Sequence, residues 1–175
     1  MSGRKRHILV DTRGNLLKIK VHPANVSESA GGQLLLTDLK PVFPRLSHLW
    51  VDQGYKAVFV HWVQETLHWT VTVVTPPYRP RGDTAKAIRE LIGDAAFEQR
   101  YAKGFRLLPR RWVVERTFAW LGKQRRLSKD YEFLSTTEET WAYLTMSRLM
   151  LRRLAQPKSY FPTFFTHFRV DTKSV

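Results

Sequence analysis

Cysteine is absent from this chain of 175 residues. Thiolate zinc sites, disulfide frameworks and thiol catalysis are therefore excluded, and the absence fits a reducing compartment. Long apolar runs are absent too, and Met1 is followed by polar and basic residues rather than by the apolar core of a signal peptide. We therefore expect a cytoplasmic protein without a membrane span.

Acidic residues are scarce relative to basic ones. The chain has 15 Asp and Glu against 29 Lys and Arg, which gives a net charge of +14 with His neutral. Hydrophobic residues make up 43% of the chain, so we expect one folded domain or a little more. Such an excess of like charge favours a polyanionic partner, with nucleic acid first and an acidic membrane surface second.

Several common catalytic motifs are missing as well. The sequence contains neither the phosphate-cradling GxxxxGK[ST] pattern nor the GxSxG pattern of serine hydrolases. His61 and His68 are seven positions apart without an HExxH pattern, which disfavours a metal site based on histidine. Any catalytic activity must therefore depend on residues outside these motifs.

The first half of the chain alternates apolar strands with helices. We expect a hairpin of residues 7–10 and 16–22, a helix from Ser27 or Ser29 to Lys40, a strand of residues 46–52, a helix of residues 55–67 and a strand of residues 69–75. The last three elements form a strand, helix, strand unit, which favours a parallel pair. Because the hairpin is antiparallel, the predicted α/β fold has a mixed sheet.

The second half is mainly helical. Proline-rich residues 76–83 predict a loop, and with a following helix at about 84–102 they suggest a loop and helix insertion over residues 76–105. A helix with a broad apolar face starts at Pro109, and another runs from about Thr137 to Ala155. Residues 156–175 have no helical period and are interpreted as a C-terminal tail after a domain of residues 1–155.

Two acids stand out as candidate metal ligands. Asp52 ends an apolar strand, where mixed sheets often place ligand-binding groups, although a turn or cap residue is the alternative. Glu115 lies within an apolar helix, where burying it is costly unless it binds a cation or pairs with Arg111, four residues earlier. Carboxylates suit Mg²⁺, and paired ions can promote phosphodiester cleavage. The two acids together therefore suggest a divalent-metal site.

Basic residues crowd the helix that carries Glu115. The candidate DNA-binding residues are Arg111, Arg116, Lys123, Arg125 and Arg126. Basic side chains neutralise phosphates, and the interleaved aromatic residues Trp112, Phe118 and Trp120 could pack beside them. The alternative is a solvated basic face above an ordinary core that contains the aromatic residues. Asp11 is assigned to the hairpin turn.

Four segments carry a family resemblance: GRKRHILVDT at 3–12, WVDQGY at 50–55, residues 109–122 and residues 125–132. From about Gly3 to Ala155 the chain closely resembles bacterial DDE transposases of the insertion-sequence-five type. The resemblance implies an RNase H-like mixed sheet flanked by helices, whose Asp, Asp, Glu triad binds two Mg²⁺ or Mn²⁺ ions for transposon excision and strand transfer.

The resemblance assigns roles to individual positions. Asp52 matches the second Asp of the triad, Glu115 matches the Glu, and Arg111 matches an Arg four residues before it. The Tyr of the family signature falls on Leu108, and its Lys falls on Gly122, with Lys123 one position further. The family signature is therefore not matched at its Tyr and Lys positions.

The first triad Asp lies, in the family, on a central strand upstream of the segment that resembles residues 3–11. This chain begins after that point, so we expect the first core strand, its Asp and the upstream DNA-recognition region to be missing. The expectation is a C-terminal portion of a transposase, from a truncated element or a downstream reading frame, which is inactive or nearly so by itself.

The leading hypothesis is a DDE transposase catalytic-domain fragment that cleaves and joins DNA when complete. The second hypothesis is a non-catalytic DNA-binding remnant that regulates transposition. A third is another RNase H-like nuclease. The expected partners are DNA, as transposon ends and target, and a full-length transposase or an upstream-frame partner, and a homo-oligomer is compatible with the sequence.

Overall fold

The computed structural model describes residues 3–55, 57–75, 78–101, 111–155 and 168–174, and for Arg111 and residues 168–174 it describes the backbone. The chain divides into two compact units. The first consists of Met1–Val74 together with Pro109–Val175, and the second of Thr75–Leu108. In the described part, no helix is long and apolar enough to span a membrane.

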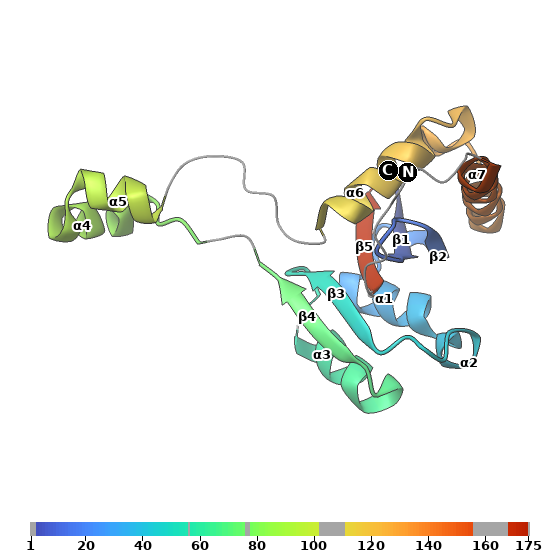
Figure 1. The fold of residues 1–175 in the computed structure, drawn as a ribbon, viewed down its shortest axis with the longest axis horizontal. Coiled ribbons are helices and arrows are strands. Elements are labelled where there is room, and N and C mark those ends of the chain that lie inside the picture. The colour runs from blue at the N-terminus through green and yellow to red at the C-terminus, as the bar shows by residue number, and fades with distance from the viewer. Residues whose placement is uncertain (1–2, 56, 76–77, 102–110, 156–167, 175) are drawn as a thin grey trace. The chain divides into compact units, whose positions relative to one another are not determined.

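The first unit contains a five-stranded sheet in the order β2-β1-β5-β3-β4 (Figure 1). The strands are β1 (Arg4–Val10), β2 (Leu16–Pro23), β3 (His48–Asp52), β4 (Thr70–Val74) and β5 (Phe168–Ser174). The pairs β1–β2 and β1–β5 are antiparallel, whereas β3–β4 and β3–β5 are parallel. The mixed sheet, with its hairpin and parallel pair, is as expected from the sequence.

The centre of the sheet is formed by the C-terminal end of the chain. Residues 156–175, expected to be a tail, contribute β5, which lies between β1 and β3. Without β5, the facing edges of β1 and β3 would need other hydrogen-bond partners. The central position that we expected to be vacant is therefore occupied, by a strand from the opposite end of the sequence.

The hairpin turn follows from its local sequence. Gly14 has a φ of 79°, which favours glycine. Asp11 Oδ1 accepts hydrogen bonds from the backbone N–H groups of Arg13 and Asn15, both at 2.8 Å, and its Oδ2 accepts one from the Asn15 side chain at 2.7 Å. The assignment of Asp11 to this turn is confirmed.

Helices cover both faces of the sheet (Figure 1). On one face, the α1 face, α1 (Glu28–Leu36) and α3 (Ala57–Trp62) supply buried residues. The α1-face core includes Leu9, Leu35, Leu36, Leu49, Val51 and Phe59. On the other, the α6 face, lie α6 (Arg111–Gly122) and α7 (Ser135–Ala155). The α6-face core includes Ile8, Val10, Ile19, Val113, Val114, Leu121 and Met146.

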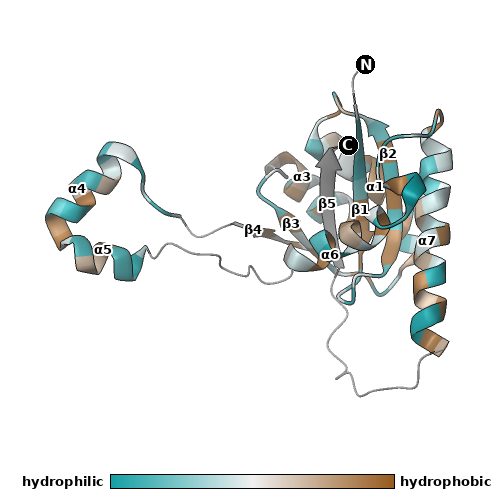
Figure 2. Cartoon of the chain, turned by 90° about the horizontal axis from the view of Figure 1, so that it is seen from above, coloured by the Kyte–Doolittle hydropathy of each residue, from teal (hydrophilic) through white to brown (hydrophobic). Residues whose placement is uncertain are grey.

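Helix α7 runs beside the outer strand β2 (Figure 2). The Glu139 carboxylate accepts a hydrogen bond from the Val21 N–H at 2.8 Å, and the Tyr143 hydroxyl accepts one from the Ile19 N–H at 3.1 Å. An exposed edge strand with unpaired N–H groups invites pairing with another chain. Side chains of α7 satisfy two of these groups and so protect this edge.

The helix expected from Ser27 or Ser29 to Lys40 is two helices. Ser27 caps α1 by accepting a hydrogen bond from the Ala30 N–H at 3.2 Å. Helix α1 ends at Leu36, and Asp38 then adopts a left-handed conformation before the short helix α2 (Leu39–Val42). The chain therefore turns earlier than Pro41, which the sequence suggested as the stop.

The helix expected over residues 55–67 is present, and another expected helix is interrupted. Residues 57–67 form α3, which continues directly into a π-helical turn, η1 (Val63–Leu67). In the second unit, α4 (Gly82–Ile92) and α5 (Asp94–Arg100) replace a single helix. Gly93 separates them with a φ of 82°, a backbone conformation that an α-helix cannot contain. A short 3₁₀ turn, η2 (Arg125–Leu127), follows α6.

Candidate metal centre and nucleic-acid interface

Asp52 is the last residue of β3 and is partly exposed. Its Oδ1 accepts a hydrogen bond from the Gly54 N–H at 2.8 Å. The turn role that the sequence left open for Asp52 is therefore present. This hydrogen bond occupies Oδ1 and orients the carboxylate, and its second oxygen is compatible with a ligand role.

Glu115 lies in the middle of α6 and is exposed. The same helix packs against the sheet through Val113 and Val114, which are buried. The sequence argument that Glu115 would be costly to bury therefore does not apply, because helical rotation turns it away from the core. Its predicted pairing with Arg111 stays untested, since the Arg111 side chain lies outside the described part.

Asp52 and Glu115 nevertheless belong to the same side of the sheet. Leu49 and Val51 belong to the α1-face core, so the alternation of a strand places Trp50 and Asp52 on the α6 face. Glu115 is part of α6, which covers that face. One strand end and one helix thus bring two acids, distant in sequence, to one side of the sheet.

No cluster of three or more His, Asp or Glu side chains suited to a metal ion occurs among the residues whose side chains the structure describes. Asp52 supplies a carboxylate at the end of β3, and Glu115 supplies one on the helix that covers the same side of the sheet. Carboxylate oxygens are hard ligands and suit Mg²⁺ or Mn²⁺ better than soft metals. The donor chemistry of the two acids therefore fits the divalent ion that the resemblance implies.

Arg116 is engaged in contacts within the protein. Its guanidinium lies 4.0 Å from the ring centroid of Trp112 and 4.8 Å from that of Trp120, and it donates a hydrogen bond to the Arg13 carbonyl at 2.8 Å. Burial lowers the pKa of Arg116, and the nearby charge of Arg153 lowers it further. The hydrogen bond to Arg13 attaches α6 to the hairpin turn, a role the sequence did not indicate.

The basic segment after α6, which we define as Lys123, Arg125 and Arg126, is exposed. Arg126 forms an ion pair with Glu132 at 3.1 Å and lies 5.4 Å from the ring centroid of Trp141. Exposed cations at the end of a helix are accessible to phosphates. This segment is therefore better suited to DNA than Arg116 is.

The basic residues at the start of β1 have a structural role. Arg4 donates to the carbonyls of Glu132 at 2.8 Å and Phe133 at 2.7 Å, and Arg6 pairs with the buried Glu138. Their partners lie more than a hundred positions away, so no spacing in the sequence could reveal them. The two arginines bind their own chain and contribute little to a polyanion surface.

A buried polar cluster lies at the N-terminal end of α1. His7 Nδ1 is 2.7 Å from His22 Nε2, and His7 Nε2 is 3.3 Å from a Glu28 carboxylate oxygen, while Lys5 pairs with the other Glu28 oxygen at 3.1 Å. Burial, aided by His22, lowers the pKa of His7 to about 4. Gly31 leaves room for the imidazoles, because a Cβ there would lie 2.4 Å from His7 Cε1. Sequence reasoning did not identify this cluster.

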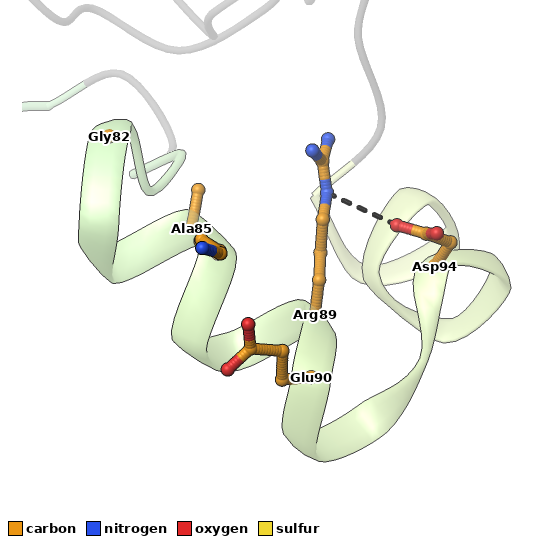
Figure 3. A pocket seen from close by; sticks show the side chains of 6 residues that line it. Gly82, Ala85, Arg89, Glu90 and Asp94 are labelled. Atoms are coloured by element: carbon orange, nitrogen blue, oxygen red, sulfur yellow. Dashed lines mark ion pairs between the residues drawn. The ribbon is translucent and has the colours of Figure 1, made fainter.

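The second unit contains a shallow pocket (Figure 3). Its lining residues are Gly82, Ala85, Lys86, Arg89, Glu90 and Asp94. Arg89 pairs with Asp94 at 3.5 Å across this pocket and also with Glu98 at 2.9 Å. Since the charges that line the pocket include such internal pairs, it lacks the converging groups expected of a catalytic site.

A family comparison agrees with these observations. The model of the transposase DDE domain matches residues 1–150, a range that includes Asp52 and Glu115. No curated protein and no solved structure matches the chain. The α/β fold, a mixed sheet flanked by helices, is consistent with the RNase H-like architecture of such domains. The match spans most of the sequence, and the chain therefore belongs to the transposase DDE domain family.

Proposed function

We propose that this protein is a catalytic portion of an insertion-sequence transposase of the insertion-sequence-five type, in which Asp52 and Glu115 hold divalent metal for DNA cleavage and strand transfer. The observation that carries the proposal is that Asp52 ends a strand on the α6 face of the sheet, while Glu115 lies on α6, the helix that covers this face. We propose a cytoplasmic protein whose partner is DNA, as transposon ends and target.

The surrounding structure supports ligand roles for both acids. The Gly54 N–H fixes one oxygen of Asp52. Helix α6 is held in place because Thr117 Oγ1 donates to the Gly14 carbonyl at 2.9 Å. When bound, Mg²⁺ or Mn²⁺ activates the attacking oxygen of a phosphoryl transfer and stabilises the leaving one. The residues of this chain orient the carboxylates that bind the metal.

DNA phosphates would be contacted by the basic segment Lys123, Arg125 and Arg126, together with Arg111 at the start of α6. Lys123 and Arg125 are exposed, and each is available to neutralise a phosphate. Arg116 contributes indirectly, because its hydrogen bond to the Arg13 carbonyl holds α6 against the hairpin turn. The proposed DNA surface therefore continues from Glu115 past the end of α6.

The test uses the full chain and Mn²⁺ binding measured by electron paramagnetic resonance. Asp52→Asn and Glu115→Gln should each weaken Mn²⁺ binding by about tenfold or more. Glu65→Gln is the control, because Glu65 is an exposed acid on η1 that pairs with His61 at 3.0 Å. Unchanged Mn²⁺ binding by Glu115→Gln would contradict the proposal.

A second candidate is a non-catalytic DNA-binding regulator of transposition. It is favoured by the lack of a three-acid cluster among the side chains that the structure describes. DNA binding that falls steeply with salt, is independent of Mg²⁺ and survives Asp52→Ala would support this second function. Binding that requires Mg²⁺ would oppose it.

A further inference from the structure

Three arginines from three elements meet at the hairpin turn between β1 and β2. Arg13 belongs to the turn, Arg116 to α6 and Arg153 to the last turn of α7. The Arg116 guanidinium donates a hydrogen bond to the Arg13 carbonyl at 2.8 Å. The Arg153 guanidinium donates one to the side-chain oxygen of Asn15, at the end of the turn, at 2.7 Å. Segments more than a hundred positions away in the sequence thus bring two cations to Arg13.

The indole of Trp120 contacts two of these cations. The Arg153 guanidinium lies 4.2 Å from its ring centroid, and the Arg116 guanidinium lies 4.8 Å from it. Contact with an aromatic ring orders a guanidinium without using its N–H donors. In the described part of the chain, the bond to Asn15 is the only hydrogen bond that the Arg153 guanidinium makes. Arg153 is therefore ordered, while most of its donors are available to a ligand.

The cluster carries more positive than negative charge. Asp11 is the acid of this turn, and its carboxylate oxygens accept hydrogen bonds within the turn itself. Among the described residues, none of the three arginines forms an ion pair. Burial lowers the pKa of Arg153, the Asp11 carboxylate raises it in part, and the charge of Arg13 lowers it again. The guanidinium groups of Arg13 and Arg153 are therefore close enough to repel each other.

We propose that Arg13 and Arg153 bind a phosphate of the DNA backbone at the hairpin turn. This inference rests on the proposed function, because DNA is the partner proposed there. Guanidinium groups match phosphate oxygens through paired, charge-assisted hydrogen bonds. A phosphate between the two arginines offsets their mutual repulsion. Arg116 acts as a positioning residue, since it holds the backbone of Arg13.

The turn lies away from Asp52 along the sheet. Val10, which immediately precedes the turn, and Trp50 are both register partners of Arg169. Strand β1 is antiparallel to β5, which is parallel to β3, so β1 runs toward the N-terminal end of β3. Asp52 is at the C-terminal end of β3. The phosphate at the turn is therefore not the one beside Asp52, and the cluster holds the DNA rather than taking part in its cleavage.

The first test measures binding of a short DNA duplex to the full chain by fluorescence anisotropy at several salt concentrations. Arg13→Gln and Arg153→Gln should each weaken binding by about fivefold or more near 0.1 M salt and reduce the salt slope by about one contact. Arg148→Gln is the matched control, because Arg148 is an exposed residue of α7 whose replacement removes the same charge. It should change the affinity by less than about twofold. Equal losses in Arg148→Gln and Arg13→Gln would overturn the proposal.

The second test asks whether Arg13 and Arg153 share one phosphate. If they do, the double variant should lose less affinity than the product of the two single losses, and a full product would overturn the proposal. Urea unfolding checks that each variant folds. The Arg13 guanidinium makes no hydrogen bond or ion pair in the described part, so Arg13→Gln provides the test even if Arg153→Gln unfolds.

Inorganic phosphate and Mn²⁺ separate the remaining explanations. Binding of inorganic phosphate, with duplex affinity unchanged in both arginine variants, would identify a site for free anions and overturn the proposal. Mn²⁺ binding should be unchanged in Arg13→Gln, because Arg13 is not among the proposed metal ligands. Unchanged duplex affinity in Arg13→Gln and Arg153→Gln, with Mn²⁺ binding still lost in Asp52→Asn, would overturn this inference and leave the proposed metal centre intact.

Discussion

Arg6 and Glu138 form a buried ion pair that links β1 to α7, although the two residues are 132 positions apart. Arg6 is 6% exposed and Glu138 is 1% exposed. Arg6 also donates to the Leu127 carbonyl at 2.9 Å, which ties η2 to the same strand. The pair therefore fixes the helices of the α6 face to the sheet that carries the proposed metal ligands.

Removing the acid of this pair should be strongly destabilising. Glu138→Gln leaves the Arg6 charge buried without its counter-ion, so we expect the free energy of unfolding to fall by about 3 kcal/mol. Urea unfolding measures the change. Asp130→Asn is the control, because Asp130 pairs with Arg4 at 3.3 Å in a more exposed position and should cost less than about 1 kcal/mol. Equal losses in the two variants would contradict this prediction.

The pKa of His7 predicts a pH dependence of stability. Burial lowers the pKa of His7 from 6.5 to about 4, so the unfolded chain binds a proton at this residue more readily than the folded protein does. Above pH 6.5, His7 therefore does not lower the free energy of unfolding. As the pH falls from 6.5 to 4, protonation of His7 in the unfolded chain lowers the free energy of unfolding, by about 3 kcal/mol in all.

The measurement compares urea unfolding at pH 7 and pH 4.5 in the original protein and in His7→Gln. The difference in unfolding free energy between the two pH values should be smaller in His7→Gln. His61→Gln is the control, since His61 lies on an exposed part of α3 and pairs with Glu65. A pH response in His7→Gln equal to that of the original protein would rule out His7 as its source.

Gly14 should not tolerate a side chain. Its φ is 79°, and a Cβ at this position would lie 2.8 Å from Thr117 Oγ1 and 3.0 Å from the Trp120 ring. Gly14→Ala should therefore lower the unfolding temperature, at a cost of about 2 kcal/mol. Gly122→Ala is the matched control, because a Cβ there meets nothing within 4 Å. A loss in Gly122→Ala as large as that in Gly14→Ala would exclude this steric explanation.

Substitution of Arg116 should lower stability, whereas substitution of Lys123 should weaken DNA binding. Arg116→Ala removes contacts with two indole rings and a hydrogen bond to Arg13, so we expect a loss of about 2 kcal/mol in unfolding free energy. Lys123→Ala should leave stability unchanged within about 0.5 kcal/mol and reduce the salt dependence of DNA binding by about one phosphate contact. DNA titrations at several salt concentrations and urea unfolding separate the two roles. An unchanged salt slope in Lys123→Ala would remove Lys123 from the proposed DNA surface.

The local sequence was sufficient for elements whose determinants are neighbours. The hairpin could be predicted because Asp11 and Gly14 shape a turn between two apolar segments. The strand ending at Asp52 and the parallel unit that follows were also predictable, since their patterns are short and regular. Helix α1 differed because Thr37 and Asp38 end it before the proline that the sequence suggested.

The candidate site was only partly predictable. Asp52 and Glu115 stood out as acids in apolar surroundings, but the sequence could not show that Glu115 is exposed. The engagement of Arg116 with the hairpin was equally hidden, because Arg13 is 103 positions away from it. These features depend on packing between distant segments.

The sequence by itself determined the α/β class, the two candidate acids and the family resemblance, because composition, periodicity and short motifs are local properties. Only the tertiary structure decided that the C-terminal strand β5 lies between β1 and β3. Strand pairing depends on backbone hydrogen bonds that any residue except proline can form, so the sequence of β5 does not specify its partners. The strands that pair with β5 are therefore determined by the arrangement of the whole sheet.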